Sequence, residues 1–294
     1  NVIFILADDW GIGDVKCFGG DRCKIATPNM DALAGQGMKF LDAHSSSSVC
    51  TPTRYGVLTG RYNWRSRLKS GVLGGFSGHL IEVEQGRTTV ANFMRDNGYV
   101  TACVGKWHLG MDLKTRDGKK PTGYGQPKAM VGKALDPAKC NIDWKAEIKN
   151  GPTAVGFDSY YGISASLDMP PYIWIKDDHF DGECTMVKAF HRPGPSHKDF
   201  FDYDVLPTIA KKSAEFVTAQ AKAKKPFFLY MPHTMPHTPL FASPKFKGKS
   251  AGGLYGDVIE EMDWSVGEVR KTLKTLGLDE NTLVIYTSDN GPWL

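Results

Sequence analysis

Short apolar runs alternate with helix-like patterns along most of the chain, and this alternation constrains the fold more than any other feature. The runs at 2–7, 99–104, 227–231 and 282–287 are bounded by turn-forming or polar residues. Continuous apolar runs of this length are typical of parallel strands that are buried on both faces. The sequence therefore predicts an α/β fold with a mostly parallel or mixed central sheet and helices on both of its faces.

The intervals between these runs contain turn and cap signals that predict further elements. These are a helix that starts at Thr27 and Pro28 and ends at Gly35 and Gly37, a strand over 38–43, a helix that starts at Thr88 and stops at Gly98, and helices near 207–224 and 254–276.

Polar residues of catalytic type directly follow four of the predicted strands. They are Asp8 and Asp9 after the first strand, Lys106, Trp107 and His108 after the second, His233 and His237 after the third, and Ser288, Asp289 and Asn290 after the last. In open α/β sheets, ligands bind outside the carboxyl ends of the strands. We therefore expect the four clusters to converge on one rim of the sheet.

Charge and hydropathy exclude two classes of function. The net charge of +4 is spread along the 294 residues and not gathered into a run, so we expect no nucleic-acid partner. No apolar stretch reaches the roughly 18 uninterrupted residues of a spanning helix, so we expect no transmembrane segment. No signal peptide opens the chain, and its 41% hydrophobic residues suffice for one large core.

The pattern weakens between about 111 and 205, where Gly, Lys, Pro and Asp are frequent and no helix period is visible. We interpret this stretch as long loops near the rim that carry substrate contacts. A surface excursion without function is the alternative.

Adjacent carboxylates at a strand end indicate a metal ion. Asp8 and Asp9 repel each other unless a cation lies between them, although such pairs are also common at turns. Together with Asp289 and Asn290 they offer only oxygen ligands. This set fits Ca²⁺ or Mg²⁺ better than zinc, which favours nitrogen and sulfur.

The run VCTPTRYGVLTGR at 49–61 combines one cysteine with a fixed spacing of proline and arginine. If 52–58 is helical, Arg54 lies one turn after Cys50 and its guanidinium can reach back to that side chain. The helix N-terminus also favours an anion at position 50. The alternatives are an ordinary buried thiol at Cys50 and a surface salt bridge at Arg54. The run resembles the sulfatase signature, Cys-x-Pro-x-Arg followed by Leu-Thr-Gly-Arg.

Other segments carry the same resemblance. They are ADD at 7–9, GKWHLG at 105–110, MPHTPL at 235–240 and SDNG at 288–291. The resemblance implies the alkaline-phosphatase-like sulfatase core and the hydrolysis of sulfate esters. It also implies that a maturation enzyme converts Cys50 to formylglycine, whose hydrated aldehyde is the nucleophile. The implied metal ligands are Asp8, Asp9, residue 50, Asp289 and Asn290, with Ca²⁺ as first choice and Mg²⁺ as second.

The resemblance implies a role for each remaining catalytic residue. Arg54 would hold the formylglycine hydroxyl and its charge, and Lys106 would bind a sulfate oxygen. His108 would accept a proton from the second hydroxyl and so expel sulfate, whereas His237 would be the general acid to the leaving alcohol. His233 has no matching role, and the prolines around it exclude a helical zinc pair with His237.

The stretches 156–162 and 241–269 are similar to the branch that contains N-acetylgalactosamine-6-sulfatases and bacterial polysaccharide sulfatases, which implies a sulfated carbohydrate substrate. Candidate substrate contacts are Lys106, His237, Asp168, Tyr172, Trp174 and His179. We expect a secreted, periplasmic or lysosomal location.

Family members usually carry a further lysine beyond the SDNG motif and a smaller C-terminal domain, neither of which is found before Leu294. We therefore expect 1–294 to be the catalytic core of a longer, here truncated, sulfatase. Two alternatives stay open. One is a phosphonate monoester or phosphodiester hydrolase of the same fold, and the other is a non-catalytic carbohydrate-binding pseudoenzyme.

Overall fold

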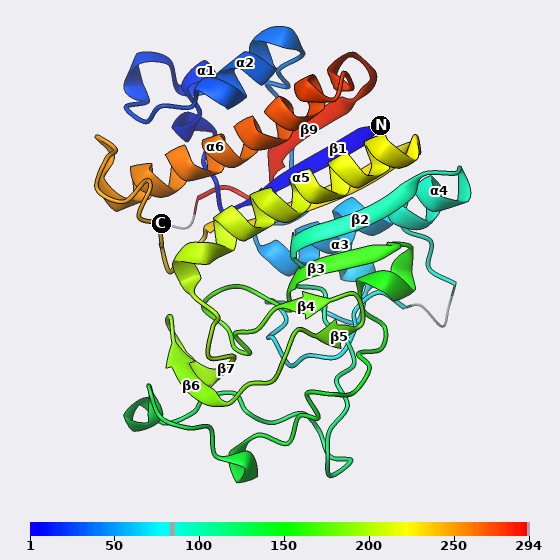
Figure 1. Ribbon diagram of the computed structural model, residues 1–294, viewed down its shortest axis with the longest axis vertical. Helices are drawn as coiled ribbons and strands as arrows, with labels where there is room; N and C mark the ends of the chain where they lie inside the picture. The colour runs from blue at the N-terminus through cyan, green and yellow to red at the C-terminus, as the bar shows by residue number, and fades with distance from the viewer. Residues whose placement is uncertain (83–85, 293–294) are drawn as a thin grey trace.

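The computed structural model describes residues 1–82 and 86–292, and in these residues seven strands form one sheet in the order β5-β4-β3-β2-β8-β1-β9 (Figure 1). The strands are β1 (Val2–Asp8), β2 (Val100–Lys106), β3 (Ser159–Ile163), β4 (Ile175–Lys176), β5 (His179–Phe180), β8 (Phe227–Pro236) and β9 (Leu283–Ser288). Five of them run parallel, whereas β4 and β5 are antiparallel additions at one edge. A separate hairpin consists of β6 (Met186–Ala189) and β7 (Pro193–Ser196). The mostly parallel, mixed sheet confirms the predicted fold class.

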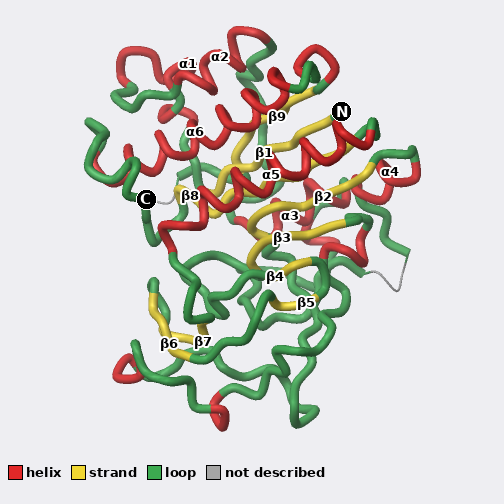
Figure 2. Tube along the Cα trace, in the orientation of Figure 1, coloured by secondary structure: helices red, strands yellow, loops and turns green. Residues whose placement is uncertain are grey.

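Helices cover both faces of this sheet (Figures 1 and 2). α5 (Val205–Ala223) and α6 (Gly253–Thr275) lie on the near face, with α1 (Lys16–Gly19) and α2 (Pro28–Gln36) beside α6, whereas α3 (Cys50–Thr59) and α4 (Val90–Asp96) lie behind the sheet. Short 3-10 helices are η1 (Ile12–Asp14), η2 (Gly20–Arg22), η3 (Asn63–Arg65), η5 (Lys128–Met130), η6 (Pro137–Lys139), η7 (Pro152–Val155), η8 (Asp202–Asp204) and η9 (Asp279–Asn281).

Successive residues of the central strands are buried in two different cores. In β8, Phe227 and Leu229 pack in the core that includes α5 and α6, whereas Phe228 and Tyr230 pack with Leu58 of α3. Side chains alternate between the faces of a strand, and here both faces are covered. The strand sequence is therefore apolar throughout and shows no alternation with polar residues.

The strand predicted over 38–43 is wrong, because this segment has no regular secondary structure. Met38, Phe40 and Leu41 are 69 to 78% exposed. A strand needs the backbone hydrogen bonds of a neighbour, and no strand in the described part of the chain pairs with this segment.

The stretch 111–205 was predicted as loops, but it also contains β3 to β7. β3 belongs to the central sheet, where Ile163 pairs with Lys106 of β2. The two-residue strands β4 and β5 are too short to show any period in the sequence. β4 forms by pairing with β3, and β5 by pairing with β4.

The predicted helix starts are close but differ in their caps. The helix expected from Thr88 begins after Thr89, whose hydroxyl caps its first turn in a capping box. α2 begins at the predicted place, yet Thr27 does not cap it. Instead, the Asp263 carboxylate of α6 accepts the first-turn N–H groups of α2 at 2.9 and 3.1 Å.

Candidate active site

Arg54 lies at the centre of a buried charge cluster at the carboxyl ends of β1, β2 and β9. Its Nε and Nη2 donate to the Asp289 carboxylate at 3.1 and 2.8 Å, and Nη2 also donates to Asp8 at 3.1 Å. Its Nη1 donates to the Lys106 carbonyl at 3.1 Å. All three ionic side chains are fully buried, so the alternative of a surface salt bridge at Arg54 is wrong. These four bonds occupy most of the five guanidinium donors.

Lys106 completes the cluster, because its Nζ donates to the second Asp8 oxygen at 2.6 Å. A side chain at the preceding Gly105 would lie 1.9 Å from the Pro232 carbonyl oxygen, so only glycine allows β2 and β8 to approach here. Burial alone would raise the pKa of Asp8, but the charges of Lys106 and Arg54 outweigh it and hold that pKa well below its usual range.

Asp9 lies beside this cluster, and no cationic side chain among the described residues is within hydrogen-bond distance of it. It adopts a left-handed backbone conformation (φ 64°), its N–H donates to Asp289 at 3.1 Å, and its carboxylate accepts from Asn290 Nδ2 at 2.6 Å. Burial, followed by the charge of Asp8, raises the pKa of Asp9 and raises the pKa of Asp289 to about 7. Among the described residues, the cations Arg54 and Lys106 thus lie beside three carboxylates, those of Asp8, Asp9 and Asp289. The cluster therefore carries more carboxylates than cations.

The residues present fit a hard divalent cation. One oxygen each of Asp8 and Asp9 and the Cys50 sulfur lie within 4.8 Å of one another. The Asn290 Oδ1 oxygen is buried and has no hydrogen-bond partner among the residues that the structure describes. Carboxylate and amide oxygens are the ligands that Ca²⁺ and Mg²⁺ prefer, and a hydroxyl oxygen at position 50 would match them better than a thiol does.

Cys50 is the first residue of α3 and is 5% exposed. Burial, followed by the charge of Asp8, raises the pKa of its thiol well above the usual value. Such a thiol stays protonated at neutral pH and is a poor nucleophile. An unmodified Cys50 is therefore ill-suited to attack an ester.

His108 presents one ring nitrogen that lacks a partner. Its Nε2 lies 2.7 Å from the Leu73 carbonyl oxygen, which can only accept, so Nε2 carries the proton. Nδ1 is buried and has no hydrogen-bond partner within the described ranges. Burial, then the charges of Lys106 and Arg54, lowers the pKa of His108 well below its usual value. The result is a neutral imidazole with an available lone pair.

The two histidines predicted to follow the third strand lie in different surroundings, because β8 extends to Pro236 and contains His233. His237 is 8% exposed, its Nδ1 lies 2.5 Å from the Thr238 carbonyl, and its Nε2 lies 3.7 Å from Asp9. His233 is fully buried and its Nε2 lies 2.8 Å from Ser265 Oγ of α6. Burial, with a contribution from Arg54, lowers the pKa of His233 to about 3. His233 is therefore a neutral structural residue.

The candidate sugar contacts are only partly grouped. Asp168 is buried and forms an ion pair with Arg192, and Tyr172 donates to the Arg192 carbonyl at 2.6 Å. Trp174 is partly buried and packs against the core on the α5 and α6 face. His179 lies on the edge strand β5, five strand positions from β1. Sequence reasoning missed Arg192, because nothing in the stretch around it connects it to Asp168.

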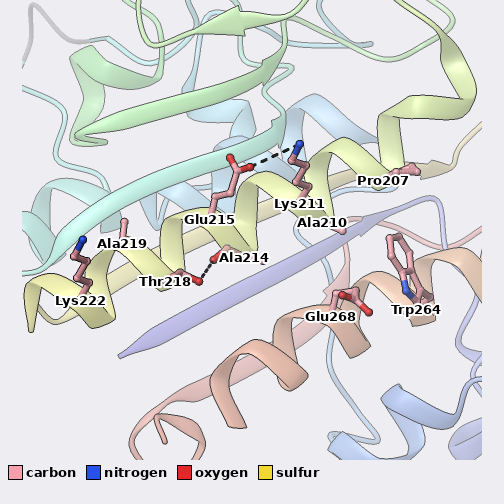
Figure 3. A pocket seen from close by; sticks show the side chains of 10 residues that line it. All are labelled: Pro207, Ala210, Lys211, Ala214, Glu215, Thr218, Ala219, Lys222, Trp264 and Glu268. Atoms are coloured by element: carbon pink, nitrogen blue, oxygen red, sulfur yellow. Dashed lines mark hydrogen bonds and ion pairs between the residues drawn. The ribbon is translucent and has the colours of Figure 1, made fainter. Parts of the chain in front are cut away.

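A cavity of about 560 Å³ lies between α5 and α6 (Figure 3). Its walls include three alanines and two lysines of α5, together with Trp264 and Glu268 of α6. The pair Lys211–Glu215 on its rim is 4.0 Å apart and largely solvated. None of its lining residues belongs to the predicted site, so we assign this groove no part in the chemistry.

Comparisons with known proteins agree on one family. A family model described as Sulfatase matches residues 1–294. The N-acetylgalactosamine-6-O-sulfatase of Bacteroides thetaiotaomicron is 32% identical over 332 residues, which cover 99% of this chain and 59% of that protein. Human steryl-sulfatase is also 32% identical, with 99% of this chain and 54% of that protein covered. The chain belongs to the sulfatase family.

A solved structure agrees at the level of the fold. It was described in work on the metabolism of multiple glycosaminoglycans by Bacteroides thetaiotaomicron, and it superposes with a TM-score of 0.82 at 32% identity over 99% of this chain and 62% of that one. The chain thus spans a little over half of the length of the curated relatives it matches. Among the described residues, no helix combines the length and the apolar character needed to cross a bilayer.

Proposed function

We propose that this protein hydrolyses sulfate esters of a carbohydrate, with formylglycine made from Cys50 by a maturation enzyme and with Ca²⁺ as the bound cation, Mg²⁺ being the second choice. The observation that carries the proposal is the buried cluster in which Arg54 and Lys106 face three carboxylates next to residue 50. The matched family supports sulfate ester hydrolysis.

The cation would be held by Asp8, Asp9, Asp289, Asn290 and the modified residue at position 50. When bound, the cation supplies Lewis-acid polarisation of sulfate oxygens, and hydrated formylglycine supplies an oxygen nucleophile. Arg54 fixes Asp8 and Asp289 relative to one another, so the ligands need no rearrangement. The hydrogen bond to Asp8 holds the Lys106 ammonium beside these ligands. In this position the ammonium would attract a sulfate oxygen.

The two histidines take opposite proton transfers. Nδ1 of His108 has a free lone pair and accepts a proton. His237 holds Nδ1 toward the Thr238 carbonyl, and we assign to Nε2 the donation to the leaving oxygen. Asp9 lies 3.7 Å from this Nε2.

A carbohydrate substrate is supported by the relative named for an N-acetylgalactosamine sulfate. Asp168 and Tyr172, which Arg192 connects, and Trp174 are the sugar contacts we propose, and His179 stays a prediction. We also propose that residues 1–294 are the catalytic domain, because the family match covers all of them. A secreted, periplasmic or lysosomal location likewise stays a prediction.

The test is a screen of the matured protein against sulfated mono- and oligosaccharides, nitrophenyl sulfate, and the matching phosphate and phosphonate esters. We expect sulfate release from at least one sugar, abolished by a chelator and restored by Ca²⁺ better than by zinc. Faster phosphonate or phosphodiester cleavage would favour the related hydrolase. Sugar binding without any release would favour the non-catalytic pseudoenzyme.

A further inference from the structure

The segment that follows β3 contains buried polar atoms that no other described residue pairs with. Ala165 and Leu167 are 1% exposed and belong to the buried apolar residues. Between them, Ser164 Oγ, Ser166 Oγ and Asp168 Oδ1 are buried and have no hydrogen-bond partner in the part of the chain that the structure describes. A buried polar atom without a partner destabilises a fold, so three within five residues call for a functional explanation.

This segment begins next to the charge cluster. Ile163, the last residue of β3, pairs with Lys106 at the end of β2, and neighbouring strands lie about 4.8 Å apart. The Ser164 carbonyl accepts the His108 N–H at 3.1 Å. The segment 164–168 therefore lies directly beside the strand end that presents Lys106 and His108.

The β6–β7 hairpin adds a cation to the same segment. Arg192 lies in the turn between the two strands, and its Nη1 donates to the Asp168 carboxylate and to the Asp168 carbonyl at 3.4 Å. The Arg192 side chain is 37% exposed, whereas that of Asp168 is 5% exposed. The hairpin is held by Tyr172, which donates to the Arg192 carbonyl. Arg192 thus closes one side of the segment and keeps part of its guanidinium accessible.

We propose that Ser164, Ser166, Asp168 and Arg192 form a subsite that recognises hydroxyls of the pyranose ring bearing the sulfate. This subsite rests on the proposed function and assigns its sugar specificity. The free Asp168 oxygen accepts from one hydroxyl and the Arg192 guanidinium donates to its neighbour, an arrangement that fits a vicinal diol. The serine hydroxyls pair with further hydroxyls.

Such a subsite selects sugar sulfates against aryl and steryl sulfates. A site whose buried polar groups pair with substrate hydroxyls rejects an analogue that lacks them, because the groups are then left unpaired. Ester groups without neighbouring hydroxyls gain nothing from 164–168. The chemistry at Lys106 and His108 is common to both substrate classes.

The sharpest test uses serine-to-alanine changes, because they remove a hydroxyl and little else. Ser164→Ala and Ser166→Ala should each lower kcat/KM for N-acetylgalactosamine 6-sulfate by about three- to tenfold, the worth of a neutral hydrogen bond, and lower kcat/KM for nitrophenyl sulfate less. Neither variant should lower the free energy of unfolding, since no protein partner is lost. Ser213→Ala is the matched control: its hydroxyl is also buried and unpaired among the described residues, but it lies within α5.

Charge variants of the same subsite should have larger effects. Asp168→Asn and Arg192→Lys should lower kcat/KM for the sugar sulfate by about ten- to hundredfold, because charged hydrogen bonds are stronger. His191→Ala, at an exposed neighbour in the same turn, controls for disturbance of the hairpin. Equal losses on both substrates, or activity losses that follow losses of stability, would overturn the subsite.

A binding measurement separates this proposal from the proposed function. Calorimetric titration of the unmatured protein with N-acetylgalactosamine 6-sulfate needs no turnover. Weaker binding by both serine variants with unchanged binding by Ser213→Ala supports the subsite even if no matured protein releases sulfate. No measurable binding, or equal binding by all variants, overturns the subsite even if the protein proves to be an active sulfatase.

Discussion

The two buried polar regions at the rim differ in how completely their groups are paired. In the Arg54 cluster, the Arg54 guanidinium and the Lys106 ammonium donate to Asp8, Asp289 and a backbone carbonyl within 3.1 Å. In 164–168, three polar atoms are equally buried and have no partner among the described residues. A fully paired cluster holds its geometry without a ligand, whereas an unpaired one is satisfied only when a ligand arrives. The first region is therefore suited to fixed electrostatics and the second to recognition.

The largest expected effect tests whether the paired cluster surrounds the nucleophile. Cys50→Ala should abolish sulfate release and leave the far-UV circular dichroism spectrum and the cooperative unfolding transition intact, because only a small side chain is lost. In protein made with a formylglycine-generating enzyme, mass spectrometry should show the peptide around Cys50 lighter than its thiol form.

Cys103→Ala, at a fully buried cysteine of β2, is the control that should keep its activity. Full activity of a protein in which only the Cys50 thiol is ever detected would refute the nucleophile assignment.

A second test contrasts the two arginines. Arg54→Met keeps most of the apolar stem but leaves Asp8 and Asp289 without a shared cation in a buried site, and removing one partner of a buried pair costs about 3–5 kcal/mol. Arg192→Met breaks a pair whose arginine is 37% exposed, although its Asp168 partner is buried, so we expect a smaller loss than for Arg54→Met. Urea unfolding of the two variants measures both, and equal losses would contradict the proposed difference between the regions.

The paired region could largely be predicted from the sequence, because its parts are local signals. The apolar runs predicted β1, β2, β8 and β9. The polar clusters at the ends of these runs could be recognised in the sequence without a structure. The spacing of Cys50 and Arg54 placed them one turn apart on a helix, and α3 spans both. Parallel strands then bring such ends together by topology alone.

The unpaired region could not be predicted in the same way, because it depends on contacts between distant segments. Arg192 reaches Asp168 through a four-residue strand pair that has no visible period. β3 acquires its place only by pairing with β2. The same limit explains the wrong strand at 38–43, since its apolar residues favour a strand but no neighbour in the described chain pairs with it.

A third test uses the histidines to separate the leaving group from the rest of the cycle. His237→Ala should slow a sugar sulfate roughly 10²- to 10⁴-fold, the usual contribution of a positioned general acid, but slow nitrophenyl sulfate much less, because its leaving group needs little protonation. His108→Ala should slow both substrates alike, because His108 is proposed to act in the release of sulfate from residue 50, a step that both substrates share. Steady-state rates on the two substrates give the comparison, and equal losses for His237→Ala would contradict this division of roles.

The smallest expected effect is a pH dependence of cation binding, which follows from the uncompensated charge in the paired cluster. The pKa values of Asp9 and Asp289 are raised above the ordinary value of 3.8, that of Asp289 to about 7. Between about pH 4 and 7 the folded protein therefore holds more protons than the unfolded chain, and the stability of the cation-free protein falls as pH rises through this window. The low pKa of Asp8 has the opposite sign, but its contribution is complete above about pH 4.

Ca²⁺ competes with the protons on Asp9 and Asp289, so the stabilisation it gives should grow over the same pH window. At a free concentration near 100 times its Kd, this stabilisation should reach about 2.7 kcal/mol at about pH 8 and fall well below that at about pH 5. Urea unfolding with and without Ca²⁺ at both pH values gives the four free energies needed. Asp289→Asn removes one of the two competing protons and should flatten the pH dependence, whereas zinc should stabilise less throughout. A Ca²⁺ effect of equal size at both pH values would mean that the cation does not bind between these carboxylates.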